Sequence, residues 1–327
     1  MSFDNIKLEK GLYTTGKGFT KALEEIDPSE NYIGTPLEGL DAYQRQLKRF
    51  DIKVSGSNSD TISKFFSTTD SAALFPEYVS RAVRQGLDEN NAVDRIVAST
   101  TVIDSLDYRA VESVTDDNFA AADIAEGAVI PQTTIKIKET LTPLKKQGRM
   151  LVASYEAIKF QKLDLFTVAL KQIGAYIANM QLADAIDTIY KSDCETIAGE
   201  TLDYASLVSL WNAFSPYNMT SILATPAAVA NILNLPEFKD AAAGFHFQST
   251  GSLVTPFGAE IIKSNFVGAD SFIVGLDKNY ALEKVQAGNV SVDYDKLIDR
   301  QLERASITSI TGFSRIFDDA SKVLTIG

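Results

Sequence analysis

Residues 108–149 restrict the possible folds more than any other segment, because their charges are sorted by sign along the chain. The second half alternates Ile135 and Ile137 with Lys136 and Lys138, which is the period of a β-strand with one solvated face. The pattern predicts a long two-armed β excursion with an acidic arm and a basic arm. The charged residues are Glu112, Asp116, Asp117, Asp123 and Glu126 in the first arm, and Lys136, Lys138, Lys145, Lys146 and Arg149 in the second.

An excursion of this kind has no room for a core of its own, and an isolated two-stranded ribbon is only marginally stable in water. Complementary charge on its arms and packing against neighbours would stabilise it. The alternative is an ordinary solvated hairpin whose charges pair weakly at the surface.

Residues 1–70 are polar and punctuated by glycine and proline, with one short helix standing out. Its apolar stripe consists of Leu40, Tyr43, Leu47 and Phe50. Asp41 is a good N-cap for this helix, and Gln44 completes a pair that resembles a capping box. A helix of two to three turns cannot bury such a stripe alone, so it docks either on the main body or on a neighbouring subunit. A flexible tail with one transient helix is the alternative.

The middle of the chain predicts two helices separated by a strand and the excursion. Pro76 suits the first turn of a helix that runs towards Gly86, which suits its C-terminal cap. Residues 96–104 alternate apolar and small polar side chains, as a strand does. A long helix covers residues 163–190, with its buried face shifting in its second half to Leu182, Ile186 and Ile189.

Residues 197–287 alternate short strands and helices, which predicts a compact α/β module. Thr225 and Pro226 begin a helix directly after the buried strand 221–224. Further strands are expected near residues 261–262, 271–274 and 280–285, and the chain returns in strands at 305–311 and 322–326.

The composition argues against an enzyme, a metal site and a nucleic-acid-binding protein. The chain of 327 residues has one histidine, His246, and one cysteine, Cys194, too few for a zinc site or an activated nucleophile. With a net charge of −12, the chain lacks the excess of basic residues that is typical of a nucleic-acid-binding protein. No signal peptide, membrane span or internal disulfide is expected, so we expect a soluble protein made inside the cell, with no catalytic residue, cofactor or metal.

The order and spacing of these parts resemble the major capsid protein of tailed bacteriophages, the Hong Kong 97-type capsid fold, over residues 71–327. The resemblance is carried by Leu74–Val79, Glu126–Ala128 with Pro131, Lys146–Ser154, Leu163–Ser192, Ile222–Pro226, Leu235–Asp240, Phe272–Asp277 and Tyr280–Leu282.

The resemblance implies an α+β fold with an N-terminal arm, an extended β loop, a peripheral domain built on a long spine helix, and an axial α/β domain. The implied parts are the arm at 1–70, the lead into the peripheral domain at 71–107, the extended loop at 108–149, the peripheral domain with spine helix at 150–196, the axial domain at 197–290, and the return to the peripheral sheet at 291–327.

A protein of this family is a structural shell subunit that assembles into hexamers and pentamers around packaged double-stranded DNA. Its expected partners are copies of itself, a portal protein and a scaffolding protein; DNA is enclosed without sequence-specific binding, and no membrane is involved. The expected location is the virion, assembled in the bacterial host cytoplasm. The extended loop would lie across an adjacent subunit and contact it through the charged residues of both arms named above, from Glu112 to Lys146. The N-terminal arm would contact a neighbouring subunit through its apolar stripe. An encapsulin-like nanocompartment shell around a cargo enzyme is the alternative.

Overall fold

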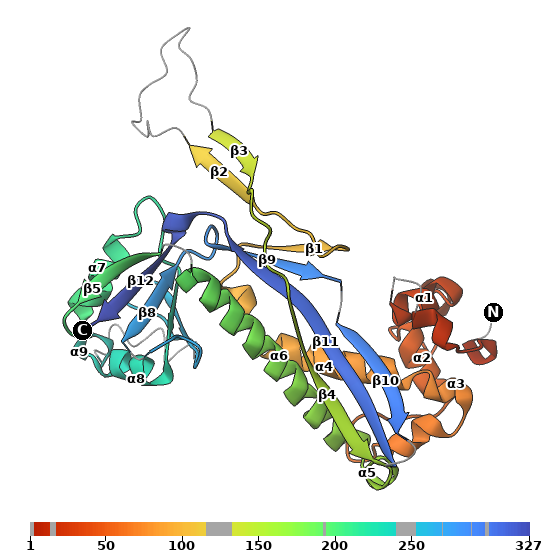
Figure 1. Cartoon of the computed structure of the whole chain (residues 1–327). Helices are drawn as coiled ribbons and strands as arrows, with labels where there is room; N and C mark the ends of the chain where they lie inside the picture. The colour runs from red at the N-terminus through yellow and green to blue at the C-terminus, as the bar shows by residue number, and fades with distance from the viewer. Residues whose placement is uncertain are drawn as a thin grey trace. The chain divides into compact units, whose positions relative to one another are not determined.

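The computed structural model describes residues 3–13, 18–115, 133–191, 194–239, 253–269, 271–288, 290–297 and 301–327 (Figure 1). The chain divides into two compact units, each assembled from segments far apart in sequence. Unit 1 consists of Met1–Asn90, Gly148–Ile177 and Val290–Ser309, and unit 2 of Asn91–Gln147, Ala178–Asn289 and Ile310–Gly327.

Unit 1 is mainly helical, with strands β4, β10 and β11 contributing to it. Its helices are the 3-10 turns η1 (Phe3–Asn5), η2 (Lys10–Tyr13), η3 (Ser29–Tyr32) and η4 (Ile62–Phe66), with α1 (Phe19–Ile26), α2 (Ala42–Arg49), α3 (Thr69–Ala72), α4 (Phe75–Glu89), α5 (Tyr155–Phe160) and the first part of α6 (Leu163–Lys191). Its strands are β4 (Lys145–Ser154), β10 (Ser291–Leu297) and β11 (Leu302–Arg315); β4 and β11 extend into unit 2. The core of unit 1 gathers aromatic rings from three helices, including Phe65, Phe75, Tyr78 and Phe166.

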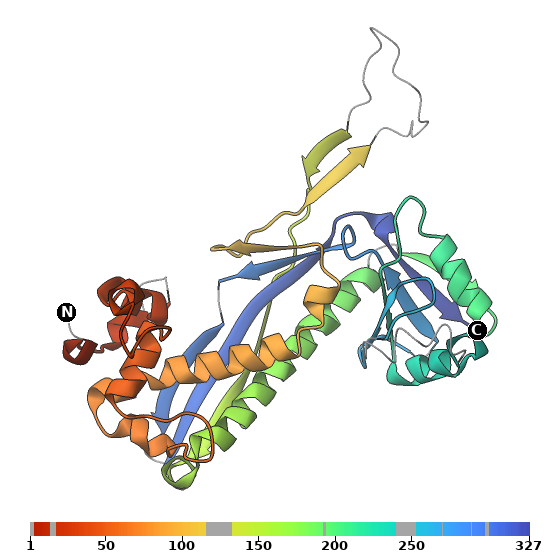
Figure 2. The same ribbon diagram turned by 180° about the vertical axis from the view of Figure 1, so that it is seen from behind.

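Helices α4 and α6 cross in direct backbone contact, side by side in Figures 1 and 2. A Cβ added at Gly86 would lie 2.1 Å from the carbonyl oxygen of Lys171, and one at Gly174 would lie 2.1 Å from that of Val83. The expectation that Gly86 caps its helix is therefore wrong, since α4 continues to Glu89. The glycine is needed because no side chain fits between the two backbones.

The long helix and the short N-terminal helix have the predicted ends. Helix α6 covers Leu163–Lys191, and its buried side chains shift to Leu182, Ile186 and Ile189 in unit 2. Helix α2 begins with the predicted capping box, in which the Asp41 carboxylate accepts a hydrogen bond from the backbone N–H of Gln44. Helix α1 has no counterpart in the sequence analysis.

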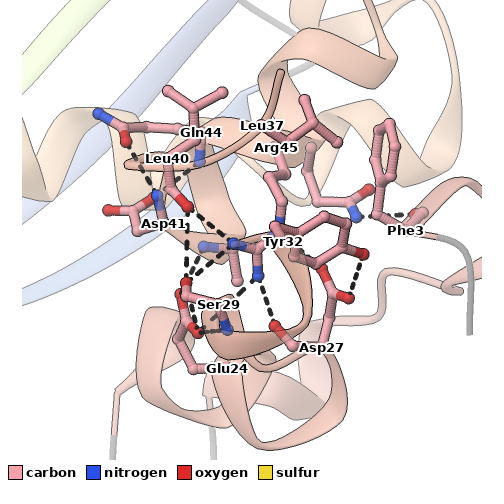
Figure 3. A network of polar contacts seen from close by, with 12 residues as sticks. Phe3, Glu24, Asp27, Ser29, Tyr32, Leu37, Leu40, Asp41, Gln44 and Arg45 are labelled. Carbon is pink, nitrogen blue, oxygen red and sulfur yellow. Dashed lines mark hydrogen bonds and ion pairs between the residues drawn. The ribbon is translucent and has the colours of Figure 1, made fainter. Parts of the chain in front are cut away.

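The N-terminal segment is held together by Arg45, whose side chain is 0% exposed (Figure 3). Its Nε donates to an Asp27 carboxylate oxygen at 2.9 Å, and its guanidinium also donates to the backbone carbonyls of Asp27 and Leu40 and to the Ser29 hydroxyl. The Tyr32 ring lies 4.3 Å from the guanidinium carbon. A buried guanidinium is tolerated here because four hydrogen bonds to one turn-rich segment satisfy its donors.

Unit 2 contains two sheets and the ribbon. Its elements are the 3-10 turns η5 (Val93–Arg95) and η7 (Asp318–Ala320), helices α7 (Tyr204–Asn212), α8 (Pro226–Asn234) and α9 (Pro236–Lys239), and strands β1 (Ser99–Ile103), β2 (Val111–Thr115), β3 (Thr133–Ile137), β5 (Glu195–Gly199), β6 (Ser221–Ala224), β7 (Glu260–Lys263), β8 (Phe272–Leu276), β9 (Leu282–Ala287) and β12 (Ser321–Ile326). One sheet contains β1, parallel to β9, which is antiparallel to β11. The other has the order β5-β12-β8-β6-β7.

The strands within residues 291–327 belong to two different sheets. Strands β10 and β11 lie in the five-stranded sheet that also contains β1, β4 and β9. Strand β12 instead lies between β5 and β8, with Val323 opposite Thr196 on one side and Val274 on the other. It is buried at Val323 and Leu324, so it completes the module that begins near residue 197.

Replacing Gly86 by Ala should lower the free energy of unfolding by about 1–3 kcal/mol, because the added methyl group forces the two backbones apart. Urea denaturation measures the change. Gly11→Ala is the matched control, since a Cβ there meets nothing within 4 Å. Equal stability of both variants would contradict the backbone contact.

Replacing Arg45 by Ala should cost about 3–5 kcal/mol, because it leaves the buried Asp27 carboxylate without its cation. Lys48→Ala, on the exposed face of the same helix, should change stability by no more than about 0.5 kcal/mol. Thermal and chemical unfolding of the full chain checks both. An Arg45→Ala protein as stable as Lys48→Ala would show that the network contributes little.

Candidate subunit-interface surfaces

Strands β2 and β3 form an antiparallel two-stranded ribbon, as the sorted charges predicted (Figure 1). Their register places Glu112 opposite Lys136 and Val111 opposite Ile137. Directly opposite residues share a face, and so do residues two apart on one strand, so Val111, Ile135 and Ile137 lie on one face. Lys136, between the two isoleucines, points to the other face.

The apolar face of the ribbon is exposed to solvent. Ile135 is 72% exposed, Ile137 69% and Val111 45%. The sequence pattern predicted one solvated face, which normally implies that the other face is covered. In the part of the chain that the structure describes, β2 and β3 pair only with each other, and neither isoleucine is covered.

Hydrogen bonds within unit 2 hold the base of this ribbon. The Tyr108 hydroxyl donates to the buried Glu283 carboxylate at 2.6 Å, and Thr101 donates to the same oxygen. Burial and the bond to this carboxylate raise the pKa of Tyr108. On the returning arm, the Lys138 ammonium donates to the Arg315 carbonyl at 2.6 Å. Both arms are thus anchored to strands of unit 2 where the ribbon begins.

The predicted charged residues of the two arms have different surroundings. Lys136 and Lys146 are exposed, whereas Lys138 is half-buried by its bond to Arg315. Lys145 forms an ion pair with Asp184 at 2.5 Å within unit 2. Four predicted residues lie outside the described residues: Asp116, Asp117, Asp123 and Glu126. The backbone of Glu112 is described in β2, opposite Lys136.

The N-terminal stripe lies against its own chain. Tyr43 is 3% and Leu47 7% exposed in the core of unit 1, while Leu40 and Phe50 are half-buried. The Arg81 guanidinium of α4 stacks 4.3 Å from the Tyr43 ring and pairs with Asp41. Of the two docking places left open by the sequence, the structure places Tyr43 and Leu47 on the main body. A role of the four stripe residues in a subunit interface stays a prediction.

The one cysteine, Cys194, is not in a setting that activates its thiol. Burial raises the pKa of the Cys194 thiol, which donates to the Ser321 carbonyl, so the reactive thiolate is disfavoured. His246 lies outside the described residues. Within the described ranges, no three His, Cys, Asp or Glu side chains come together as a metal site. No helix found there has both the length and the apolar character to cross a bilayer.

Sequence reasoning missed a second set of exposed apolar side chains, in unit 1. Phe160, at the end of α5, is 72% exposed, and Leu165 and Val168 of α6 are 63% and 61% exposed. Leu165 and Val168 are three residues apart, so they share one face of the helix. Helix α6 has apolar residues on nearly all of its faces. One buried stripe needs fewer apolar positions than this, and the excess could have indicated an exposed apolar surface on this helix.

Comparison with solved structures identifies the fold. The capsid of a native GTA particle matches with a TM-score of 0.55 at 15% identity, covering 73% of this chain and 90% of that one. The Gordonia phage Cozz matches with a TM-score of 0.53 at 14% identity, covering 72% and 87%. The SrpI encapsulin of Synechococcus elongatus PCC 7942 matches with a TM-score of 0.50 at 14% identity, covering 71% and 86%. These likenesses confirm the predicted α+β fold of the Hong Kong 97 type.

A search of curated proteins found no matching sequence. A sequence-family profile described as phage capsid protein matches residues 137–314, which is more than half of the chain. The matched region begins at the end of β3 and covers β4, α6, residues 197–287 of the α/β module and most of β11, but not β12. The chain therefore belongs to the phage capsid protein family, and it is a subunit of a capsid shell.

Proposed function

We propose that this protein assembles, through hexamers and pentamers, into the icosahedral shell of a tailed phage or prophage that encloses double-stranded DNA. The observation that carries the proposal is the exposed apolar face of the ribbon, formed by Val111, Ile135 and Ile137. In a shell, this face lies across a neighbouring subunit.

Burial of that face supplies free energy for assembly. Covering a large aliphatic side chain stabilises a protein by about 1.5–3 kcal/mol. A shell subunit repeats the contact at each neighbour, so modest contacts add up over the particle. The anchored base of the ribbon, with Tyr108 on Glu283 and Lys138 on the Arg315 carbonyl, reduces the ordering entropy lost on contact.

The net negative charge of the chain supports a shell that encloses DNA without binding it tightly. With a net charge of −12, the wall repels phosphates and leaves packaged DNA free to be threaded in and out. DNA would then be enclosed without sequence-specific contacts. The proposal includes a portal protein and, if one is needed, a separate scaffolding protein as partners, no enzymatic activity, and assembly in the cytoplasm of a bacterial host before the protein resides in the virion.

A nanocompartment shell around a cargo enzyme is the second candidate, favoured by the match to the SrpI encapsulin. The contents of particles purified after expression in the source host separate the two. DNA with a portal at one vertex supports the phage shell, whereas a cargo enzyme without DNA or portal supports the compartment.

Replacing Ile135 and Ile137 together by Ser should strongly reduce the yield of particles while leaving the subunit folded, because both side chains are already solvated in the single chain. Electron microscopy and sedimentation measure assembly, and circular dichroism with thermal unfolding measures folding. Ile33→Ser is the matched control, because Ile33 is 72% exposed, as Ile135 is. Normal particles from the double variant would refute the ribbon contact.

Charge reversal should have different effects at two neighbouring lysines, Lys136 in β3 and Lys138 just after it. Lys136→Glu should weaken assembly more than folding, because Lys136 is exposed. Lys138→Glu should also lower the stability of the subunit, since it removes the donor to the Arg315 carbonyl. The measurements are particle yield and midpoint of urea unfolding for each variant. Equal loss of assembly and stability in Lys136→Glu would contradict the role of this lysine between subunits.

A further inference from the structure

Unit 1 presents an exposed aromatic side chain, Phe160, at the end of α5. The Phe160 side chain is 72% exposed, and the Lys159 ammonium lies 5.6 Å from its ring centroid. Lys162, also exposed, follows two residues later. An exposed phenylalanine beside two cations combines a large apolar surface with positive charge, which is the composition of an interface anchor.

The backbone around this projection is well fixed. The Ser154 hydroxyl caps α5 by accepting from the Ala157 N–H, and the Gln161 N–H donates to the Ala157 carbonyl. The Gln161 carbonyl in turn accepts from the N–H of Ile62, the first residue of η4. Because the ring is presented on an ordered backbone, little backbone entropy is lost when it inserts into a partner.

Unit 1 also contains an apolar pocket of about 580 Å³. The volume lies in the range of pockets that hold small ligands, so an aromatic ring has room. Leu8 and Phe75, each 3% exposed, are among its most buried lining residues, and Phe66, Pro76 and Val292 are among its other apolar lining residues. These residues come from the N-terminal segment, η4, α4 and β10.

The charged residues of the pocket have the sign opposite to that of the projection. Its lining includes three carboxylates, from Glu9, Asp70 and Asp293, and one ammonium, from Lys7. Lys7 lies 2.5 Å from Glu9, and this bond and the charge of Asp70 raise the pKa of Lys7. One ammonium cannot balance three carboxylates, so the pocket is anionic. It therefore favours the binding of an apolar group flanked by lysines.

Projection and pocket are neighbours on one unit. Helix α5 packs on η4, and η4 ends at Phe66 in the pocket wall. When two complementary features lie close together on one surface, a two-fold axis between two copies satisfies both at once. A contact of this kind is self-complementary and closes with two molecules.

We propose that Phe160 of one subunit inserts into the pocket lined by Phe66, Phe75 and Val292 of a second copy, and that the second copy returns the same contact. Lys159 and Lys162 then face Glu9, Asp70 and Asp293 of the partner copy. This inference rests on the proposed shell function and adds a second, two-fold contact to that of the ribbon.

The test replaces Phe160 by a photo-crosslinking phenylalanine analogue in the full chain, which keeps the aromatic shape. Chains labelled with heavy and light nitrogen are mixed, assembled and illuminated, and mass spectrometry maps crosslinks between the two isotopic forms. The expected crosslinks join position 160 to the peptides that carry residues 66–76 or 292–293 of the other copy. Crosslinks to the ribbon region around Ile135, or only within one chain, would overturn the proposal.

A charge-swap cycle gives an independent readout. Lys159→Glu and Asp293→Lys should each reduce particle yield by about tenfold, as truncation of a central interface residue does, and the double variant should restore it. Phe160→Ser should reduce yield without changing unfolding, in contrast to Ile33→Ser, whose side chain is equally exposed. Failure of the double variant to restore assembly, or normal particles from Phe160→Ser, would exclude the contact.

Electron microscopy of the wild-type protein keeps the two proposals apart. Wild-type particles together with unaffected Phe160 variants would disprove this contact alone. Absence of wild-type particles under all assembly conditions would disprove the shell function and this inference with it.

Discussion

A two-stranded ribbon has no second layer, so the apolar side chains on one of its faces stay in water until another molecule covers them. This constraint acts on β2 and β3, where Ile135 and Ile137 alternate with lysines and are about two-thirds exposed or more. The rest of unit 2 fixes where that ribbon starts, through the bonds of Tyr108 and Lys138 to the sheet strands. A chain that positions an uncovered apolar surface so firmly is suited to binding other copies of itself.

The N-terminal segment resolves the same physical problem in the opposite way. Its stripe residues Tyr43 and Leu47 are covered by the chain's own core, and a buried Arg45 satisfies the carbonyls of the turns around them. Packing against the chain's own core stabilises this short amphipathic helix, which would be only marginally stable alone. The two elements that the sequence singled out as lacking a partner thus differ: one finds its partner within the subunit, and the other is left uncovered.

Periodicity predicted the elements whose burial depends on local spacing alone. The stripe of α6, including its shift to Leu182 and Ile186, and the capping box at Asp41 could be read from the sequence because side chains three or four residues apart decide them. Gly86 could not be interpreted correctly, since its reason is the backbone of Lys171, distant in sequence. Burial of Arg45 likewise depends on carbonyls and a carboxylate brought together by turns. The exposed Phe160 side chain and the pocket near Phe66 could not be predicted, because both depend on segments distant in sequence that meet only in the folded chain.

The position of β12 has a consequence for biosynthesis. In the sheet order β5-β12-β8-β6-β7, the strand that joins β5 to the others is the last of the five to be translated. Until residues 321–326 leave the ribosome, β5 has no strand beside it and the edge of β8 is unpaired. A nascent polypeptide therefore cannot complete this five-stranded sheet before residues 321–326 have been synthesised and can enter between β5 and β8.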